Sequence, residues 1–220
     1  MTATIEKMIT ATVSINQPQG VLPVADAEES GARSALYAVL SHLFIAAPTQ
    51  PLLQQIAGSR QAIADDQSAL ALAWNRLCDA ARDADAATVC HEFDEVFVTT
   101  GRPPVSLYAS SYMAGRQRGQ LLAELREDLR QMGFERSADS NEYEDHLSAL
   151  CDVMRGLIVD EAAAADAFAA QQVFFRNYFA PWYERVCTAI GSAEQAAFYR
   201  PVAKFAHAFF ANESEYFELA

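Results

Sequence analysis

The sequence has little that would indicate a metal or redox centre. Its four cysteines form no CxxC pair, and no cluster of histidines accompanies them. Zinc and iron–sulfur sites need closely spaced ligands, so neither is expected, and nothing in the cysteine pattern requires disulfides. Cys78, Cys90 and Cys151 lie within helical patterns, where we expect them to be small core residues.

Long apolar runs and basic residues are also scarce. No stretch approaches the run of about 18 apolar residues that a membrane-spanning helix needs, and residues 1–16 lack the apolar segment and cleavage site of a secretory signal. The chain has 16 Lys and Arg against 29 Asp and Glu, a net charge of −13. Such a surface repels nucleic acid and favours a basic partner, although acidity more often serves solubility alone. We therefore expect a soluble, cytoplasmic protein that does not bind nucleic acid.

What the sequence does contain is helical periodicity. Apolar residues recur three and four positions apart in successive segments, while paired strands, hairpin turns and internal repeats are missing. We predict an all-α single domain of eight to ten helices over residues 30–215, with Ser30 capping the first helix. Residues 1–29 are predicted to be a disordered tail, and the polar segment 135–141 a hinge between two halves.

One stretch, residues 92–108, joins a helix to a stiff loop. Phe93, Val96 and Phe97 form one apolar face, because they are spaced three and four apart. The opposite side is acidic, with Glu92, Asp94 and Glu95. Pro103 and Pro104 each lack an amide hydrogen, so we expect the helix to end near Phe97. The loop then displays Val105, Leu107 and Tyr108, which need either the protein's own core or a partner.

The densest polar cluster is Glu142–His146, at the start of a predicted helix over 142–160. Asp145 and His146 form either a general acid/base pair or half a metal site, or they simply favour the positive end of the helix dipole. A metal-dependent hydrolase built on His91, Asp145 and His146 is one alternative. The phosphate-loop and dinucleotide fingerprints are absent, and Ser110-Ser111 lack a nucleophile-elbow context. The residues alone therefore favour a binding module over an enzyme, with no cofactor.

Five segments, in order over about residues 30–212, carry a resemblance to a known family. They are Arg33-Ser-Ala-Leu-Tyr37 continuing to Leu43-Phe44 and Pro48; Glu92-Phe93-x-x-Val96-Phe97 followed by Pro103-Pro104-x-Ser106-x-Tyr108; Glu144-Asp145-His146-Leu147; Phe174-Phe175 with Trp182; and Phe198-Tyr199 followed by Phe209-Phe210. This ordered set resembles the TorD/DmsD family of cytoplasmic chaperones, which also takes in the more distant NarJ-type proteins. Glu144 replaces a proline of the family pattern and Tyr178 a common histidine, which bears on the subfamily only.

The resemblance implies an all-helical chaperone for a molybdopterin oxidoreductase. Such proteins bind the twin-arginine signal peptide of the catalytic subunit's precursor and hold it back from export until the molybdenum cofactor is inserted. The resemblance further implies two halves joined by a hinge, in a monomer or a domain-swapped homodimer. A nucleotide-regulated adaptor is another alternative, although no phosphate-binding loop supports it.

The matching motifs also imply the residues of a signal-peptide site. The residues carried over are Phe97, Pro103, Pro104, Ser106, Tyr108, Glu144, Asp145 and His146, with Glu92 and Val96 as weaker candidates. A signal peptide is basic at one end and apolar beyond it, so carboxylates beside an apolar groove suit it. Asp145 and Glu144 are expected to meet the arginines, and the aromatic and proline residues the apolar part.

Overall fold

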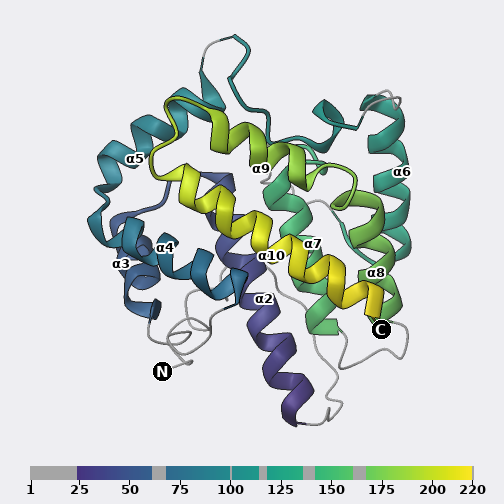
Figure 1. Ribbon diagram of the computed structural model, residues 1–220. Coiled ribbons are helices and arrows are strands. Elements are labelled where there is room, and N and C mark those ends of the chain that lie inside the picture. Colours follow the sequence, from purple (N-terminus) through teal and green to yellow (C-terminus); the bar gives the residue numbers. More distant parts are fainter. Residues whose placement is uncertain are drawn as a thin grey trace.

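The computed structural model describes residues 24–60, 68–99, 101–113, 118–135, 142–160 and 167–219. These residues contain nine α-helices and no strand, which confirms the all-α prediction (Figure 1). The helices are α2 (Val24–Ile45), α3 (Gln50–Gly58), α4 (Ala69–Asp83), α5 (Ala86–Phe93), α6 (Arg118–Gln131), α7 (Leu147–Asp160), α8 (Ala167–Tyr178), α9 (Tyr183–Ser192) and α10 (Tyr199–Leu219). The expected tail as far as residue 23 and the expected hinge at 136–141 lie outside the described residues.

Capping residues fix several of these helix ends. The side chain of Ser68 accepts a hydrogen bond from the backbone N–H of Ala71 at 3.1 Å and so begins α4. Asp85 begins α5 in the same way, through Thr88 N at 3.0 Å. Gly133 has a φ of +82°, a conformation that glycine adopts without steric cost, just after the end of α6.

Two helix starts differ from the prediction. Helix α2 begins at Val24, before the expected cap at Ser30. Helix α7 begins at Leu147, because residues 142–146 form a turn and pair with a distant loop. Pro201 introduces no break, since it is the third residue of α10, where a backbone N–H has no partner within the helix.

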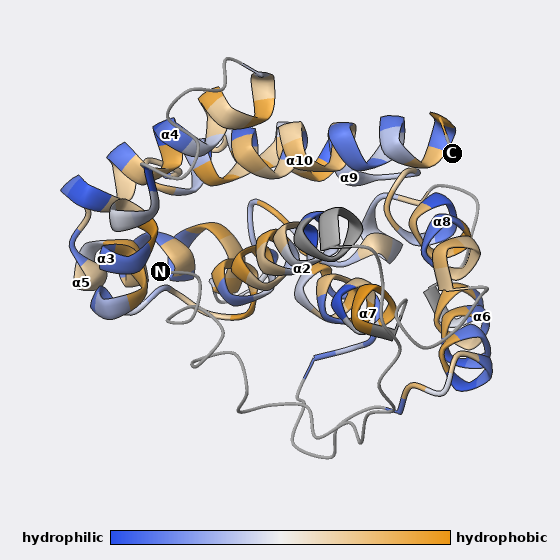
Figure 2. Ribbon diagram, turned by 90° about the horizontal axis from the view of Figure 1, so that it is seen from below, coloured by the Kyte–Doolittle hydropathy of each residue, from blue (hydrophilic) through white to orange (hydrophobic). Residues whose placement is uncertain are grey.

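The core is built around α2, which packs along α7 and lies beneath α10. Helix α10 also packs on α9 and α4, α8 on α7, and α3 on α4. Figure 2 shows α4 and α10 as a layer over α2 and α7, with α6 and α8 at one side. Large aromatic side chains fill the space between these helices: Tyr37, Phe44, Phe174, Phe179, Trp182, Tyr199, Phe205, Phe209 and Phe210.

Two buried polar groups tie the last helix to distant parts of the chain. Arg33 on α2 donates two hydrogen bonds, each 2.8 Å, to the carboxylate of Glu213 on α10, and Tyr37 donates a third at 2.9 Å. Glu92 accepts from the backbone N–H groups of Phe198 and Tyr199 at 2.9 and 2.7 Å. It therefore stabilises the start of α10, and the prediction that it lines an outer acidic face is wrong.

Single side chains also depart from the expected core. Cys78 and Cys151 are buried as predicted, but Cys90 is exposed. Val173 on α8 is 47% exposed. The larger side chains Phe93 on α5 and Phe174 on α8 are buried instead. Within the described residues, no helix is long and apolar enough to span a bilayer.

Candidate functional site

The predicted site begins where helix α5 changes its winding and ends. The backbone continues from α5 as a short π-helix, η2 (Asp94–Val98), a feature that is frequent at functional positions. Gly101 follows with a φ of +109°, in the region that favours glycine. Residues 101–113, here called the proline loop, then run across the molecule and end in a 3-10 turn, η3 (Ala109–Ser111).

The proline loop pairs with the segment 142–147 that precedes and opens α7. Tyr108 and His146 form an isolated antiparallel bridge. Ala109 N donates to Asp145 O, and Leu147 N donates to Leu107 O, both at 2.9 Å. Tyr108, Asp145 and His146, which come from two separate sequence motifs, therefore lie side by side, and Ser106 lies in the same loop as Tyr108.

Asp145 is the most deeply buried of these residues. Its exposed fraction is 0%, and its Oδ2 accepts a hydrogen bond from Ser110 N at 3.0 Å. Its other carboxylate oxygen, Oδ1, is buried and has no donor within the described part of the chain. A buried acceptor in that state costs about 1–3 kcal/mol until a donor reaches it. The arrangement suits a ligand that brings N–H groups.

His146 is buried beside Asp145 and is held in its neutral form. Burial lowers its pKa below the ordinary 6.5, although the nearby Glu142 and Asp145 carboxylates act in the opposite direction. The backbone N–H of Ser148 points at His146 Nδ1 at 3.3 Å, and the Ser148 hydroxyl lies 2.7 Å from the same atom. Because Nδ1 accepts, the ring proton sits on Nε2. His146 therefore acts as a structural acceptor at the start of α7.

Side-chain contacts of the loop strengthen its pairing with segment 142–147. The hydroxyl of Tyr108 donates to Glu142, and the Tyr108 ring packs edge-on against His146 with centroids 5.0 Å apart. Ser106 and Ser111 share a hydrogen bond of 2.7 Å within the loop. Ser106 thus shapes the loop, and Tyr108 is half-buried between the loop and the acidic segment.

Glu144 has an internal partner that the sequence pattern did not reveal. Arg126 on α6 reaches its carboxylate through Nε at 2.9 Å and through a terminal nitrogen at 3.0 Å. The Glu144 side chain is only 10% exposed, whereas that of Arg126 is 50% exposed. The two residues are 18 positions apart, so the contact depends on how α6 packs beside the segment and has no sequence signal.

The apolar candidates lie in η2 and at the start of the proline loop, next to the hydrophobic core. Phe97 is half-buried, with its ring centroid 4.9 Å from that of Tyr199 and 5.2 Å from that of Phe93. Pro103 is half-buried and Pro104 exposed. The structure therefore places Phe97 partly in the core and leaves the two prolines and the 58% exposed Val98 at the surface.

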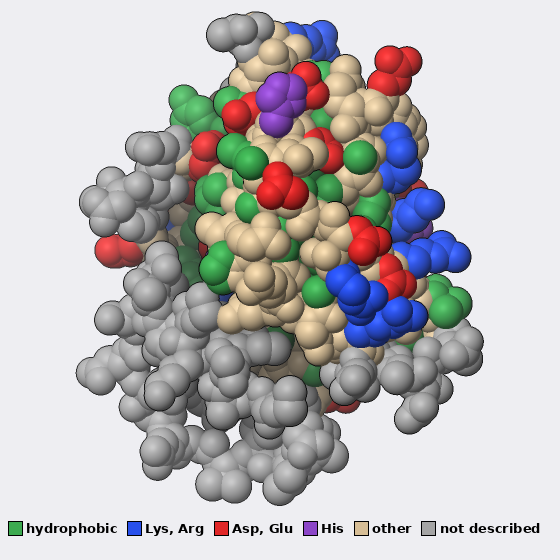
Figure 3. All heavy atoms as spheres, turned by 90° about the vertical axis from the view of Figure 1, so that its left-hand side faces the viewer, with side chains coloured by type: hydrophobic (Ala, Val, Ile, Leu, Met, Phe, Trp, Pro, Cys, Tyr) green, Lys and Arg blue, Asp and Glu red, His purple; other side chains and the backbone are tan. Residues whose placement is uncertain are grey.

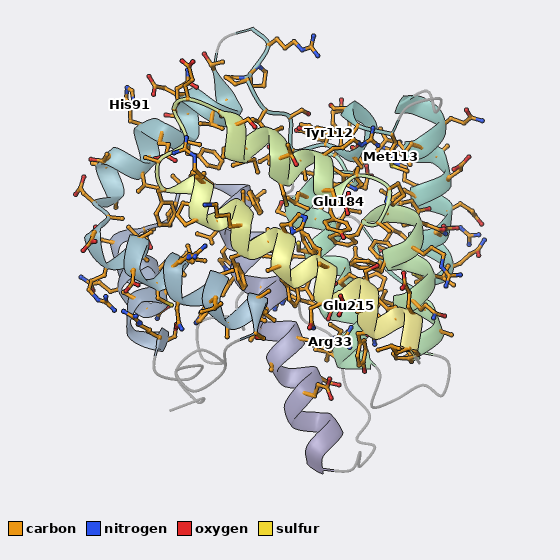
Figure 4. All side chains as sticks on the ribbon, in the orientation of Figure 1. Arg33, His91, Tyr112, Met113, Glu184 and Glu215 are labelled. Carbon is orange, nitrogen blue, oxygen red and sulfur yellow. The ribbon has the colours of Figure 1, made fainter. Side chains whose placement is uncertain are left out.

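The alternative of a metal-dependent hydrolase finds no support in this geometry. Figure 4 shows His91 on α5, well apart from Tyr112 and Met113 at the end of the proline loop. His91 is exposed and faces Glu95 at 3.5 Å. Across the described ranges, no group of three His, Cys, Asp or Glu side chains is placed to hold a metal ion.

The face formed by α3, α4 and α5 offers a contrast to the proline loop. Figure 3 shows this side with hydrophobic side chains interspersed among acidic and basic ones. Its ion pairs are exposed, such as Arg60–Asp79 and Arg82–Asp79. Such pairs contribute little to stability and mark an ordinary solvated surface.

A comparison with protein families agrees with the sequence motifs. A family model described as nitrate reductase delta subunit matches residues 63–188, which is more than half of the 220 residues. The match contains both the proline loop and segment 142–147. A comparison with curated proteins gave no match.

Proposed function

We propose a function from the premise that this chain belongs to the nitrate reductase delta subunit family, whose members are chaperones for molybdoenzyme maturation and not catalysts. We infer that it binds the twin-arginine signal peptide of a molybdopterin oxidoreductase precursor. Membership confirms the resemblance found in the sequence. The chaperone would act in the cytoplasm and hold the precursor until its cofactor is inserted. Its state as a monomer or a domain-swapped homodimer stays a prediction.

The observation that carries this proposal is the buried Oδ1 of Asp145, which has no donor among the described residues. Arginine carries five N–H donors in a planar fork and is the side chain best suited to such an oxygen. Glu144 and Glu142 lie in the same segment and add negative charge beside it. The hydrogen bonds of the proline loop to segment 142–147 are few enough for a local shift to admit a guanidinium.

The apolar part of the signal peptide would follow the proline loop away from Asp145. At the start of the loop Pro104 is exposed and Pro103 half-buried, and in the preceding η2 Val98 is exposed and Phe97 half-buried. These side chains can contact apolar groups of the peptide without hydrogen bonds to its backbone, which suits leaders whose apolar sequences vary. The basic and apolar ends of the peptide would thus meet different ends of one loop.

Calorimetry with a synthetic twin-arginine leader tests the proposal. We expect micromolar or tighter binding that weakens when both arginines become lysines. Asp145→Asn should also weaken binding, because the amide keeps an acceptor for Ser110 N and places a donor where the guanidinium would bind.

Asp152→Asn is the matched control, since it removes the same charge from an exposed site on α7 that pairs with Arg155. It should bind as the wild type does. If the wild-type protein binds no leader, or binds the two-lysine leader equally well, the proposal is wrong.

A further inference from the structure

The Arg126–Glu144 pair has the geometry of arginine recognition. Two nitrogens of one guanidinium face two oxygens of one carboxylate, at 2.9 and 3.0 Å. This two-point contact is the strong form of the arginine–carboxylate interaction. It lies next to Asp145, in the segment that the proposed function assigns to the arginines of the signal peptide.

We propose that Arg126 is an internal competitor of the signal peptide, and that an incoming arginine displaces it from Glu144. This inference rests on the proposed function and concerns the regulation of the same site. The exchange replaces one guanidinium by another, so Glu144 keeps a partner throughout. Because Arg126 holds the carboxylate in fork geometry, the vacated position selects arginine over lysine, whose ammonium is a point charge.

The exposures of the two side chains fit this exchange. Arg126 is half exposed on α6, so its long side chain can swing into solvent, while the nearly buried Glu144 stays in place. An ion pair with one partner exposed to solvent contributes little to stability, so a ligand with further contacts can displace Arg126. A peptide therefore binds Glu144 only if its contacts are stronger than those of Arg126, which a peptide with arginine in the correct position achieves.

Removing the competitor should strengthen leader binding. For Arg126→Gln we expect the Kd of the twin-arginine leader to fall about threefold to fivefold, which corresponds to an ion pair of about 1 kcal/mol. Arg126→Lys keeps the charge and loses the fork, so its Kd should lie between those of Arg126→Gln and the wild type.

Arg130→Gln is the matched control for the loss of positive charge. Arg130 lies one turn further along α6 and makes the same kind of two-point contact, but with Glu127 of its own helix. Its replacement should leave the Kd unchanged. An equal gain in affinity in both variants would show a general charge effect and overturn the proposal.

A double replacement identifies Glu144 as the object of the competition. In a Glu144→Gln background the carboxylate is gone, so Arg126→Gln should no longer change the Kd. If Arg126→Gln gives no gain in the wild-type background while the wild type binds the leader through its arginines, only the competition is wrong. If the wild type binds no leader, the proposed function itself is wrong.

Discussion

His146 has a structural role, because it holds the proline loop against the start of α7. The family pattern carries an aspartate followed by a histidine, which on sequence alone is compatible with acid–base chemistry. In the fold, the ring accepts from Ser148 N and packs against Tyr108, so it joins the start of α7 to the proline loop. Its lowered pKa follows from burial and keeps Nδ1 free to accept.

This residue predicts a pH dependence of stability with a definite sign. Because the pKa is depressed in the fold, the unfolded chain takes up a proton first as the pH falls through the ordinary 6.5. Stability from the neutral ring is fully present above that pH and is lost progressively below it. His146→Gln should therefore show a smaller fall in the free energy of unfolding between about pH 7.5 and 5.5 than the wild type.

Urea unfolding at both pH values measures this effect, and His207→Gln is the control. His207 is exposed on α10, and its replacement should keep the wild-type pH dependence. An unchanged pH dependence in His146→Gln would contradict the role of a buried neutral ring.

Among the elements, α10 depends most on contacts from distant parts of the chain. Glu92 satisfies the backbone at its start, and Arg33 meets Glu213 about four turns further on. Arg33 also lies over the ring of Tyr216 at 4.4 Å. The Arg33–Glu213 pair is almost completely removed from solvent, at 7% and 0% side-chain exposure, so its two charges are tightly interdependent.

Breaking this pair from one side should be costly. Glu213→Gln leaves the Arg33 guanidinium buried without a counter-charge, and we expect a loss of about 3–5 kcal/mol in the free energy of unfolding. Replacing both residues, as Arg33→Met with Glu213→Leu, should cost less than Glu213→Gln alone, because no charge is then left buried.

Denaturant unfolding of the three proteins decides this point. If Glu213→Gln unfolds as the wild type does, the pair contributes nothing to holding α10 on α2. If the double replacement is the least stable of the three, the shape of the pair matters more than its charge.

Local signals in the sequence account for several helix ends. Ser68, Asp85 and Gly133 fix helix ends through contacts within a few residues, which a linear pattern contains. The start of α7 was misplaced, because segment 142–146 pairs with a loop more than 30 residues away. The spacing of apolar residues likewise does not predict that η2 is a π-helix.

At the scale of the molecule, long-range contacts decide what the sequence pattern leaves open. The polar site residues Ser106, Tyr108, Asp145 and His146 were predicted from two motifs, but only the fold shows that the motifs pair. Arg126 was not predicted, since nothing in its helical pattern distinguishes it from Arg130. The same holds for Glu213, which is 180 positions from its partner.

The family match covers only part of the helices that pack together in the fold. Residues 63–188 include α4 to α8, but α2, α3 and α10 lie outside that range. Helix α2 packs along α7, and α10 covers α4 and α9. The matched segment therefore contains the proposed site, while the flanking helices complete the core against which it packs.

The central claim is that the leader binds where the proline loop meets segment 142–147. Amide hydrogen exchange of the full-length protein, with and without a twin-arginine leader, tests it most directly. We predict slower exchange over 101–113 and 142–147 when the leader is bound, with α3 and α4 unchanged. Protection confined to α3 and α4, or none in the proline loop at a saturating leader concentration, would contradict the account.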